Sequence, residues 1–219
     1  MSLVILNFHG VGPIPRKIDD AEHDCWLEED TFKAVLDLTR GQAHVQLTFD
    51  DGNASDAGIV LPALLRRGLQ ATFFMCSDRL DQPTFLSRTQ VRELLSRGMR
   101  IGSHGVAHIS WRRLSPDRFC DELEGSRRVL EGVCGSPVET AACPFGAYDR
   151  AVLKGLRRAG YRLVYTSDGG TSAENHWLQP RTTVTRLMTL DDVQRLVQHG
   201  PGLLEQLSID ARILVKRLR

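Results

Sequence analysis

The stretch "LTFDDGNASD", residues 47–56, runs an apolar segment directly into two adjacent acids and a glycine. On a strand, neighbouring side chains face opposite sides, and two adjacent carboxylates raise one another's pKa. Two interpretations of Asp50 and Asp51 are therefore open. The first is a solvated turn, because Asp-Asp-Gly is ordinary turn composition. The second is a metal site, in which a cation stabilises both carboxylates and gives them separate roles.

Strand-like and helix-like patterns alternate along the chain on both sides of this stretch. Segments typical of strands cover 3–8, 44–49, 71–75, 99–103, 138–142, 161–166 and 178–184, and helix-like segments cover 28–40, 56–68, 87–98, 115–135 and 149–160. This alternation predicts an α/β fold with a parallel sheet. About seven strands predict a distorted (β/α)7-like barrel of mainly parallel strands with surrounding helices, whose chemistry collects at the C-terminal ends of the strands.

Composition limits the function classes. The 219 residues are 42% hydrophobic and 25% charged, which suits a single globular domain over residues 1–219. A net charge of +1 gives no indication of nucleic-acid binding. We find no run of about 18 apolar residues and no signal-peptide pattern, so we expect no transmembrane segment and a cytoplasmic location. Five scattered cysteines, without a C-x-x-C pair, predict buried, reduced thiols.

A pair of histidines follows the strand expected at 99–103. In "GSHGVAHISW" (102–111), His104 and His108 are four residues apart, a spacing that lets both imidazoles bind one ion on a helical turn. Alone, such a pair is more often a surface feature. Together with a carboxylate from a neighbouring strand end, it makes a two-histidine, one-carboxylate set that leaves coordination positions open.

A third loop, "AACPFGAYD" (141–149), also follows an expected strand. Pro144 and Gly146 make a tight turn, which can present a backbone N–H such as that of Phe145 to a developing oxyanion. A plain strand-to-helix turn is the alternative.

In this order, "LTFDDG", "SHGVAH" and "CPFGAYD" resemble motifs one to three of the polysaccharide deacetylases (NodB homology, carbohydrate esterase family 4). The resemblance covers roughly residues 3 to 185. "NFHGVG" (7–12), "ACPFG" (142–146), "GYRLVYTSDGG" (160–170) and "LQPRTTV" (178–184) are similar to the branch that includes poly-N-acetylglucosamine deacetylases.

The resemblance assigns roles to individual residues. It implies that Asp51, His104 and His108 bind the metal, that Asp50 is the catalytic base, and that the Phe145 N–H supports the oxyanion. Many members carry an arginine in motif three that orients the base, but Ala142 stands near that position, and Arg181 is our candidate replacement.

The general acid also departs from the usual pattern. No late Leu-x-His motif is evident, and His199 is expected to end a helix. In the narrower branch the acid resembles the histidine of the N-terminal strand, here His9. A structural histidine is the equally weighted alternative for His9. Cys143 replaces the usual aromatic residue, and a small buried filler is expected there in preference to a reactive thiol.

The activity implied is metal-dependent removal of an N-acetyl group from an amino sugar: an oligo- or polysaccharide, or a nucleotide- or lipid-linked sugar. The cofactor implied is one divalent metal ion, with zinc preferred and cobalt, nickel, iron or manganese compatible with the ligand set. Two alternatives stay open: a hydrolase of another amide or an acetyl ester, and a non-catalytic carbohydrate-binding relative.

The tail "ARILVKRLR" (211–219) carries four basic residues and no acid. A terminal helix with a basic face is preferred to membrane-surface contact, because nine residues bury little apolar area.

Overall fold

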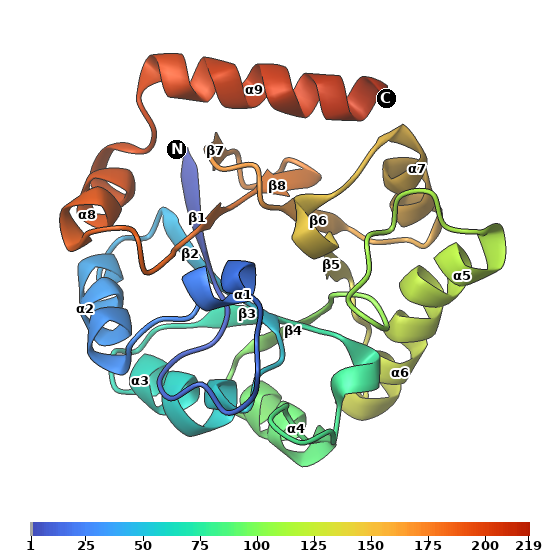
Figure 1. Ribbon diagram of the computed structural model, residues 1–219, viewed down its shortest axis with the longest axis horizontal. Helices are drawn as coiled ribbons and strands as arrows, with labels where there is room; N and C mark the ends of the chain where they lie inside the picture. Colours follow the sequence, from blue (N-terminus) through green and yellow to red (C-terminus); the bar gives the residue numbers. More distant parts are fainter. Residues whose placement is uncertain (1) are drawn as a thin grey trace.

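One sheet organises the computed structural model, which describes residues 2–219 (Figure 1). Its strands are β1 (Leu3–Phe8), β2 (Val45–Asp51), β3 (Ala71–Met75), β4 (Arg100–Ser103), β5 (Thr140–Ala142), β6 (Leu163–Thr166), β7 (Thr171–Ser172), β8 (Leu178–Pro180) and β9 (Thr182–Thr183). The order is β7-β1-β2-β3-β4-β5-β6-β8, and β9 also pairs with β1. Strands β1 to β6 and β8 run parallel to their neighbours, as the alternating pattern predicted, whereas β7 lies antiparallel to β1.

The late segment of the chain joins the two ends of this sheet. Strand β8 pairs with β6, and β9, which begins two residues later, pairs with β1. Residue 181 separates the two short strands. The sheet therefore nearly closes into a barrel, and the predicted strand 178–184 is interrupted because it changes partner at Arg181.

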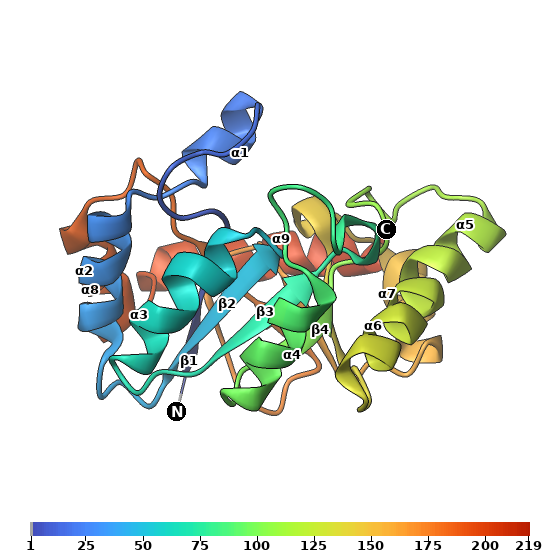
Figure 2. The same ribbon diagram turned by 90° about the horizontal axis from the view of Figure 1, so that it is seen from below.

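Helices surround the sheet (Figures 1 and 2). They are α1 (Asp20–Asp24), α2 (Glu29–Thr39), α3 (Leu61–Leu65), α4 (Arg88–Ser96), α5 (Pro116–Cys120), α6 (Ser126–Cys134), α7 (Arg150–Arg158), α8 (Leu190–His199) and α9 (Leu203–Leu218). Short π-helical turns, η1 (Asp56–Val60) and η3 (Asp121–Gly125), lead into α3 and α6, and 3-10 turns form η2 (Ser77–Arg79) and η4 (Pro144–Gly146). Helix α8 ends at His199, as predicted.

A cluster of aromatic rings packs the sheet against the helices. The ring centroid of Phe49 lies 5.2 Å from that of Phe8 and 4.8 Å from that of Phe73, and Phe32 of α2 packs edge-on against the first two. Because side chains alternate along a strand, the neighbours of these phenylalanines face the barrel interior. Thr48 and Asp50 of β2 are two such residues, and both are buried.

Several features differ from the sequence prediction or extend it. The short helix α1 and strand β7 were not predicted. The tail belongs to the longer α9, where Lys216 donates a 3.1 Å hydrogen bond to the Gly146 carbonyl. The five cysteines are free thiols, but the predicted burial holds only for Cys76 and Cys143, because Cys25 and Cys134 are half-buried and Cys120 is exposed.

Within residues 2–219, no helix combines the length and the apolar character needed to span a membrane. The cytoplasmic location, the single-domain assignment and the membrane contact of the tail stay predictions.

Candidate metal and catalytic site

The two adjacent acids of motif one end strand β2 and are almost fully buried, at 2% exposed for Asp50 and 3% for Asp51. Asp51 has a φ of 77°, in the left-handed region that non-glycine residues seldom adopt, and Gly52 follows with a φ of 70°. The chain thus leaves strand geometry at Asp51. This departure explains how two neighbouring residues, which would face opposite sides of a regular strand, both serve one site.

Asp50 is held by a two-pronged ion pair with Arg181. The guanidinium nitrogens NH1 and NH2 donate to Asp50 Oδ1 and Oδ2 at 2.7 and 2.8 Å. Arg181 is fully buried, and its Nε donates to the Thr166 carbonyl at 3.0 Å. The guanidinium also lies 5.2 Å from the ring centroid of Phe74. The structure therefore places the sequence candidate Arg181 directly against Asp50, although the two residues are 131 positions apart.

Two further inward-facing residues complete this network. Asn7 of β1 donates from Nδ2 to Asp50 Oδ2 at 3.0 Å and accepts a 2.7 Å bond from Arg181 at Oδ1. The Thr48 hydroxyl donates to the same Asn7 oxygen at 2.8 Å. Burial alone would raise the pKa of Asp50, but the Arg181 charge, with smaller contributions from His104 and His9, lowers that pKa far below its ordinary value. Asp50 is therefore an ionised carboxylate.

The second loop brings both histidines to the same rim. His104 is 1% exposed and lies directly after β4. Its Nδ1 is 2.8 Å from the Ala142 carbonyl oxygen, so Nδ1 carries the proton and donates, which leaves the Nε2 lone pair free to bind an ion. His108 reaches the site through a φ of 53°, and its ring centroid is 5.1 Å from that of His104.

Asp51, His104 and His108 each place one ligand atom within 4.8 Å of the others. His108 Nε2 lies 3.3 Å from Asp51 Oδ1. Burial lowers the pKa of His108 to about 4 against an opposing contribution from Asp51, so the imidazole is neutral at pH 7, as a metal ligand must be. One carboxylate oxygen and two imidazole nitrogens at this spacing fit a divalent transition metal such as zinc.

A cation already lies against this ligand set. Arg79, at the end of η2, donates from NH1 to Asp51 Oδ1 at 2.7 Å. The guanidinium thus lies where positive charge stabilises the buried Asp51. Sequence reasoning missed Arg79, because nothing in "FFMCSDRL" distinguishes it from any other arginine that follows a strand.

The third loop places Phe145 beside His108. Phe145 has a φ of 58° inside η4, and its ring centroid lies 4.5 Å from that of His108, with 68% of the residue exposed. The amides of Gly146 and Ala147 bond to Cys143 and Pro144, whereas the Phe145 N–H has no partner within the described part of the chain. Such a strained turn with a free donor suits an oxyanion site.

His9 directly follows β1, and Phe8 at the end of that strand is in register with Phe49 of β2, so His9 lies at the same rim as Asp50. Its Nδ1 is buried and has no hydrogen-bond partner among residues 2–219. A purely structural histidine would have such a partner, so this finding favours a role toward a ligand. Burial raises the pKa of Cys143 to about 12, which matches the inert filler predicted there.

Glu122 fixes the shape of the histidine loop and was also missed by sequence reasoning. This buried carboxylate of η3 accepts hydrogen bonds from the Val106 N–H at 2.8 Å and from the indole N–H of Trp111 at 3.3 Å. Arg118 lies 3.2 Å from it and balances its charge. Because glutamates on helices are common, only the tertiary contact reveals this function.

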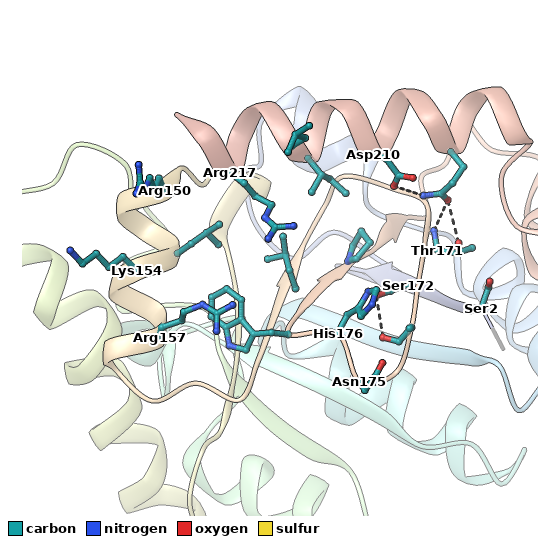
Figure 3. Close-up of a pocket in the computed structure, with 18 residues that line it drawn as sticks. Ser2, Arg150, Lys154, Arg157, Thr171, Ser172, Asn175, His176, Asp210 and Arg217 are labelled. Atoms are coloured by element: carbon teal, nitrogen blue, oxygen red, sulfur yellow. Dashed lines mark hydrogen bonds between the residues drawn. The ribbon is translucent and has the colours of Figure 1, made fainter.

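A separate groove of about 1320 Å³ lies on the outside of the barrel between α7 and α9 (Figure 3). Basic side chains border it: Arg150, Lys154 and Arg157 from α7, and Arg217 from α9. Among the residues that line it, none comes from the three rim loops. The candidate site is therefore identified by its cluster of reactive side chains and not by the size of a cavity.

Comparisons with known proteins find related sequences and similar folds. A family profile described as polysaccharide deacetylase matches residues 37–164, a range that includes Asp50, Asp51, His104, His108 and Phe145. YxkH of Bacillus subtilis is 26% identical over 188 residues, which cover 79% of this chain and 67% of that protein. The chain covers 37% and 50% of the next two curated relatives, from Bacillus subtilis and Bacillus cereus.

Two solved structures share the fold. The Streptococcus pyogenes deacetylase PplD, in complex with acetate, superimposes with a TM-score of 0.78 at 20% identity, over 90% of this chain and 99% of that chain. IcaB from Ammonifex degensii superimposes with a TM-score of 0.76 at 21% identity, over 90% of this chain and 97% of that chain. At this level of identity the agreement concerns the barrel itself.

We predict that His104→Ala and His108→Ala each lose tight binding of a divalent metal, because two ligands cannot hold the ion that three hold. Elemental analysis after dialysis against zinc measures the metal content. The exposed His199→Ala, at the end of α8, is the matched control and should retain the wild-type content. Equal metal content in all three variants would contradict the ligand set.

Proposed function

The chain belongs to the polysaccharide deacetylase family, and we propose that it is a metal-dependent hydrolase that removes an N-acetyl group from an amino sugar and releases acetate. The observation that carries this proposal is that the two acids of motif one have different partners. Asp51 joins His104 and His108 in a set of ligand atoms within 4.8 Å of one another, while Asp50 is bound to Arg181 and stays outside that set. One acid is thus available to a metal and the other to a proton.

Asp51, His104 and His108 would hold a divalent ion, which would supply Lewis-acid polarisation of the acetyl carbonyl and of a water molecule. Zinc is the ion we propose first, and cobalt, nickel, iron and manganese suit the same ligands.

Asp50 accepts the proton of the attacking water. Its Oδ1 accepts one hydrogen bond and its Oδ2 accepts two, so the carboxylate retains acceptor capacity. Arg181 keeps Asp50 ionised but also makes it a weak base, because the charge that lowers a pKa also lowers proton affinity. Such a base cannot deprotonate ordinary water, whose pKa is about 15.7. This mismatch supports metal dependence.

The remaining groups act on the other side of the scissile bond. The free Phe145 N–H donates a hydrogen bond to the oxygen that gains negative charge, and one donor of this type contributes about 3 kcal/mol to the transition state. His9, at the end of β1, donates a proton to the leaving amine nitrogen. The sugar acceptor is proposed by class only: an N-acetylated oligo- or polysaccharide, or a nucleotide- or lipid-linked N-acetyl sugar.

The non-catalytic alternative loses its main support in the structure. That alternative rested on the arginine missing near Ala142 and on the missing late histidine. Arg181 lies against Asp50 at 2.7 Å from another part of the chain, and His9 directly follows β1, the strand that pairs with β2 up to the residue before Asp50.

Acetate release tests the proposal. Metal-reconstituted protein should release acetate from at least one member of a panel of N-acetylated sugars. Asp50→Asn should keep the metal and lower kcat by about 10²- to 10⁴-fold, the usual contribution of a general base. Asp30→Asn, at a fully exposed carboxylate, is the control and should behave as wild type. Normal turnover by Asp50→Asn would show that its role is misassigned.

Removing Arg181 should shift the pH dependence of kcat/KM. Arg181 lowers the pKa of Asp50, so wild type keeps an ionised base down to low pH. In Arg181→Met the largest contribution that lowers the pKa of Asp50 is gone, so the effect of burial is opposed only by the smaller contributions of His104 and His9, the pKa of Asp50 rises, and the acidic limb moves to higher pH. Arg181→Lys should shift the limb less, because it keeps the charge. The exposed Arg162→Met is the control, and an unmoved limb in Arg181→Met would contradict the assignment.

His9→Gln should lose the basic limb of the pH–rate profile and lower kcat by about 10²- to 10⁴-fold, because the proton donor is gone. Its metal content should equal that of wild type. His199→Gln serves as the matched control in both measurements. A wild-type profile in His9→Gln would assign the general acid to another group.

A further inference from the structure

Two guanidinium groups lie on one aromatic ring beside the metal ligands. The central guanidinium carbon of Arg79 is 4.9 Å from the ring centroid of Phe85, and that of Arg16 is 4.6 Å from the same centroid. Arg16 precedes helix α1, which stands beyond the ends of the strands in Figure 2. Arg16 and Arg79, which are 63 positions apart in the chain, therefore place two positive charges side by side at the mouth of the site.

The two arginines differ in how their charges are balanced. Arg16 forms an ion pair with Glu22 and also donates to Asn53 Oδ1 at 3.1 Å. Arg79 has one hydrogen-bonded partner within residues 2–219, Asp51 Oδ1, and Asp51 belongs to the candidate metal ligand set. The side chain of Arg79 is 25% exposed, so part of it is accessible to a ligand.

Once Asp51 binds a divalent ion, the part of the site around Asp51 and Arg79 carries excess positive charge. Asp50 is already balanced by Arg181, and Glu22 by Arg16. The ion, the single negative charge of Asp51 and the charge of Arg79 then sum to +2. A half-buried excess of this size attracts an anion and is stabilised by binding one.

We propose that Arg79 is an oxyanion-binding residue that makes the site selective for acetylated amino sugars bearing a phosphate or carboxylate near the acetamido group. The planar guanidinium matches the two oxygens of such a group, and the Phe85 ring holds its plane. The inference rests on the proposed function, because it concerns the substrate of the same site.

Binding to an inactive protein tests this selectivity separately from turnover. In the metal-loaded Asp50→Asn background, calorimetry measures the affinity for N-acetylglucosamine 1-phosphate, for N-acetylmuramic acid and for the neutral methyl glycoside of N-acetylglucosamine. At least one anionic sugar should bind more tightly than the neutral one, and which one does so identifies phosphate or carboxylate as the group recognised. Adding Arg79→Ala should weaken the binding of that anionic sugar by about 10- to 100-fold, the usual contribution of a charged hydrogen bond. The affinity for the neutral sugar should stay nearly unchanged.

Arg128→Ala is the matched control, since it removes one positive charge from an exposed side chain of α6 and should preserve the preference. Arg79→Lys should retain part of the preference, because it keeps the charge without the planar fork. The metal affinity of Arg79→Ala should equal or exceed that of wild type, because a cation beside the ligands has been removed.

Three results would overturn the inference: no preference for an anionic sugar, a preference that survives in Arg79→Ala, or an equal weakening of anionic and neutral sugars with reduced metal affinity. The last result would make Arg79 a positioning residue for Asp51. Absence of acetate release by the wild type is a different failure, because it contradicts the proposed function while the binding ratios still report on Arg79.

Discussion

The buried ion pair between Asp50 and Arg181 is the interaction on which the rest of the site depends. It joins strand β2 to the residue at which the late segment changes from β8 to β9, so one contact links the catalytic rim to the closure of the barrel. Both partners are almost fully buried, and losing one would leave the other uncompensated at a cost of about 3–5 kcal/mol. Asn7 connects this ion pair to β1, because its side-chain amide forms hydrogen bonds with both Asp50 and Arg181.

This pair also separates the roles of two adjacent acids. Arg181 binds both oxygens of Asp50, whereas Asp51 lies together with the two histidines. The left-handed backbone at Asp51 turns the chain out of the strand at that point. The two neighbouring carboxylates would otherwise repel each other, but each is stabilised by a different cation. The guanidinium of Arg181 stabilises Asp50, and Arg79 or a metal stabilises Asp51.

Charge balance connects the chemistry to the choice of substrate. In the proposed mechanism Asp50 is an ionised but weak base that needs an acidified water, and a metal that supplied this acidity would leave Arg79 without its own counter-ion. The same ion would thus make the mouth of the site electropositive. The basic groove between α7 and α9 shares none of these groups and lies on the outside of the barrel.

The sequence by itself determined the alternation of strands and helices, the parallel sheet, and the three loops that carry Asp51, His104 and Phe145, because hydrophobic periodicity and turn residues act over a few positions. It nominated Arg181 only as a substitute for a residue missing elsewhere. Tertiary structure alone decided that Arg181 reaches Asp50 and that Arg79 contacts Asp51, one of the three candidate metal ligands. The physical reason is that the local sequence does not specify the partner of an arginine, because its local conformational preferences are the same at surface and buried positions. The partner is determined only when strands distant in sequence become neighbours in the closed sheet.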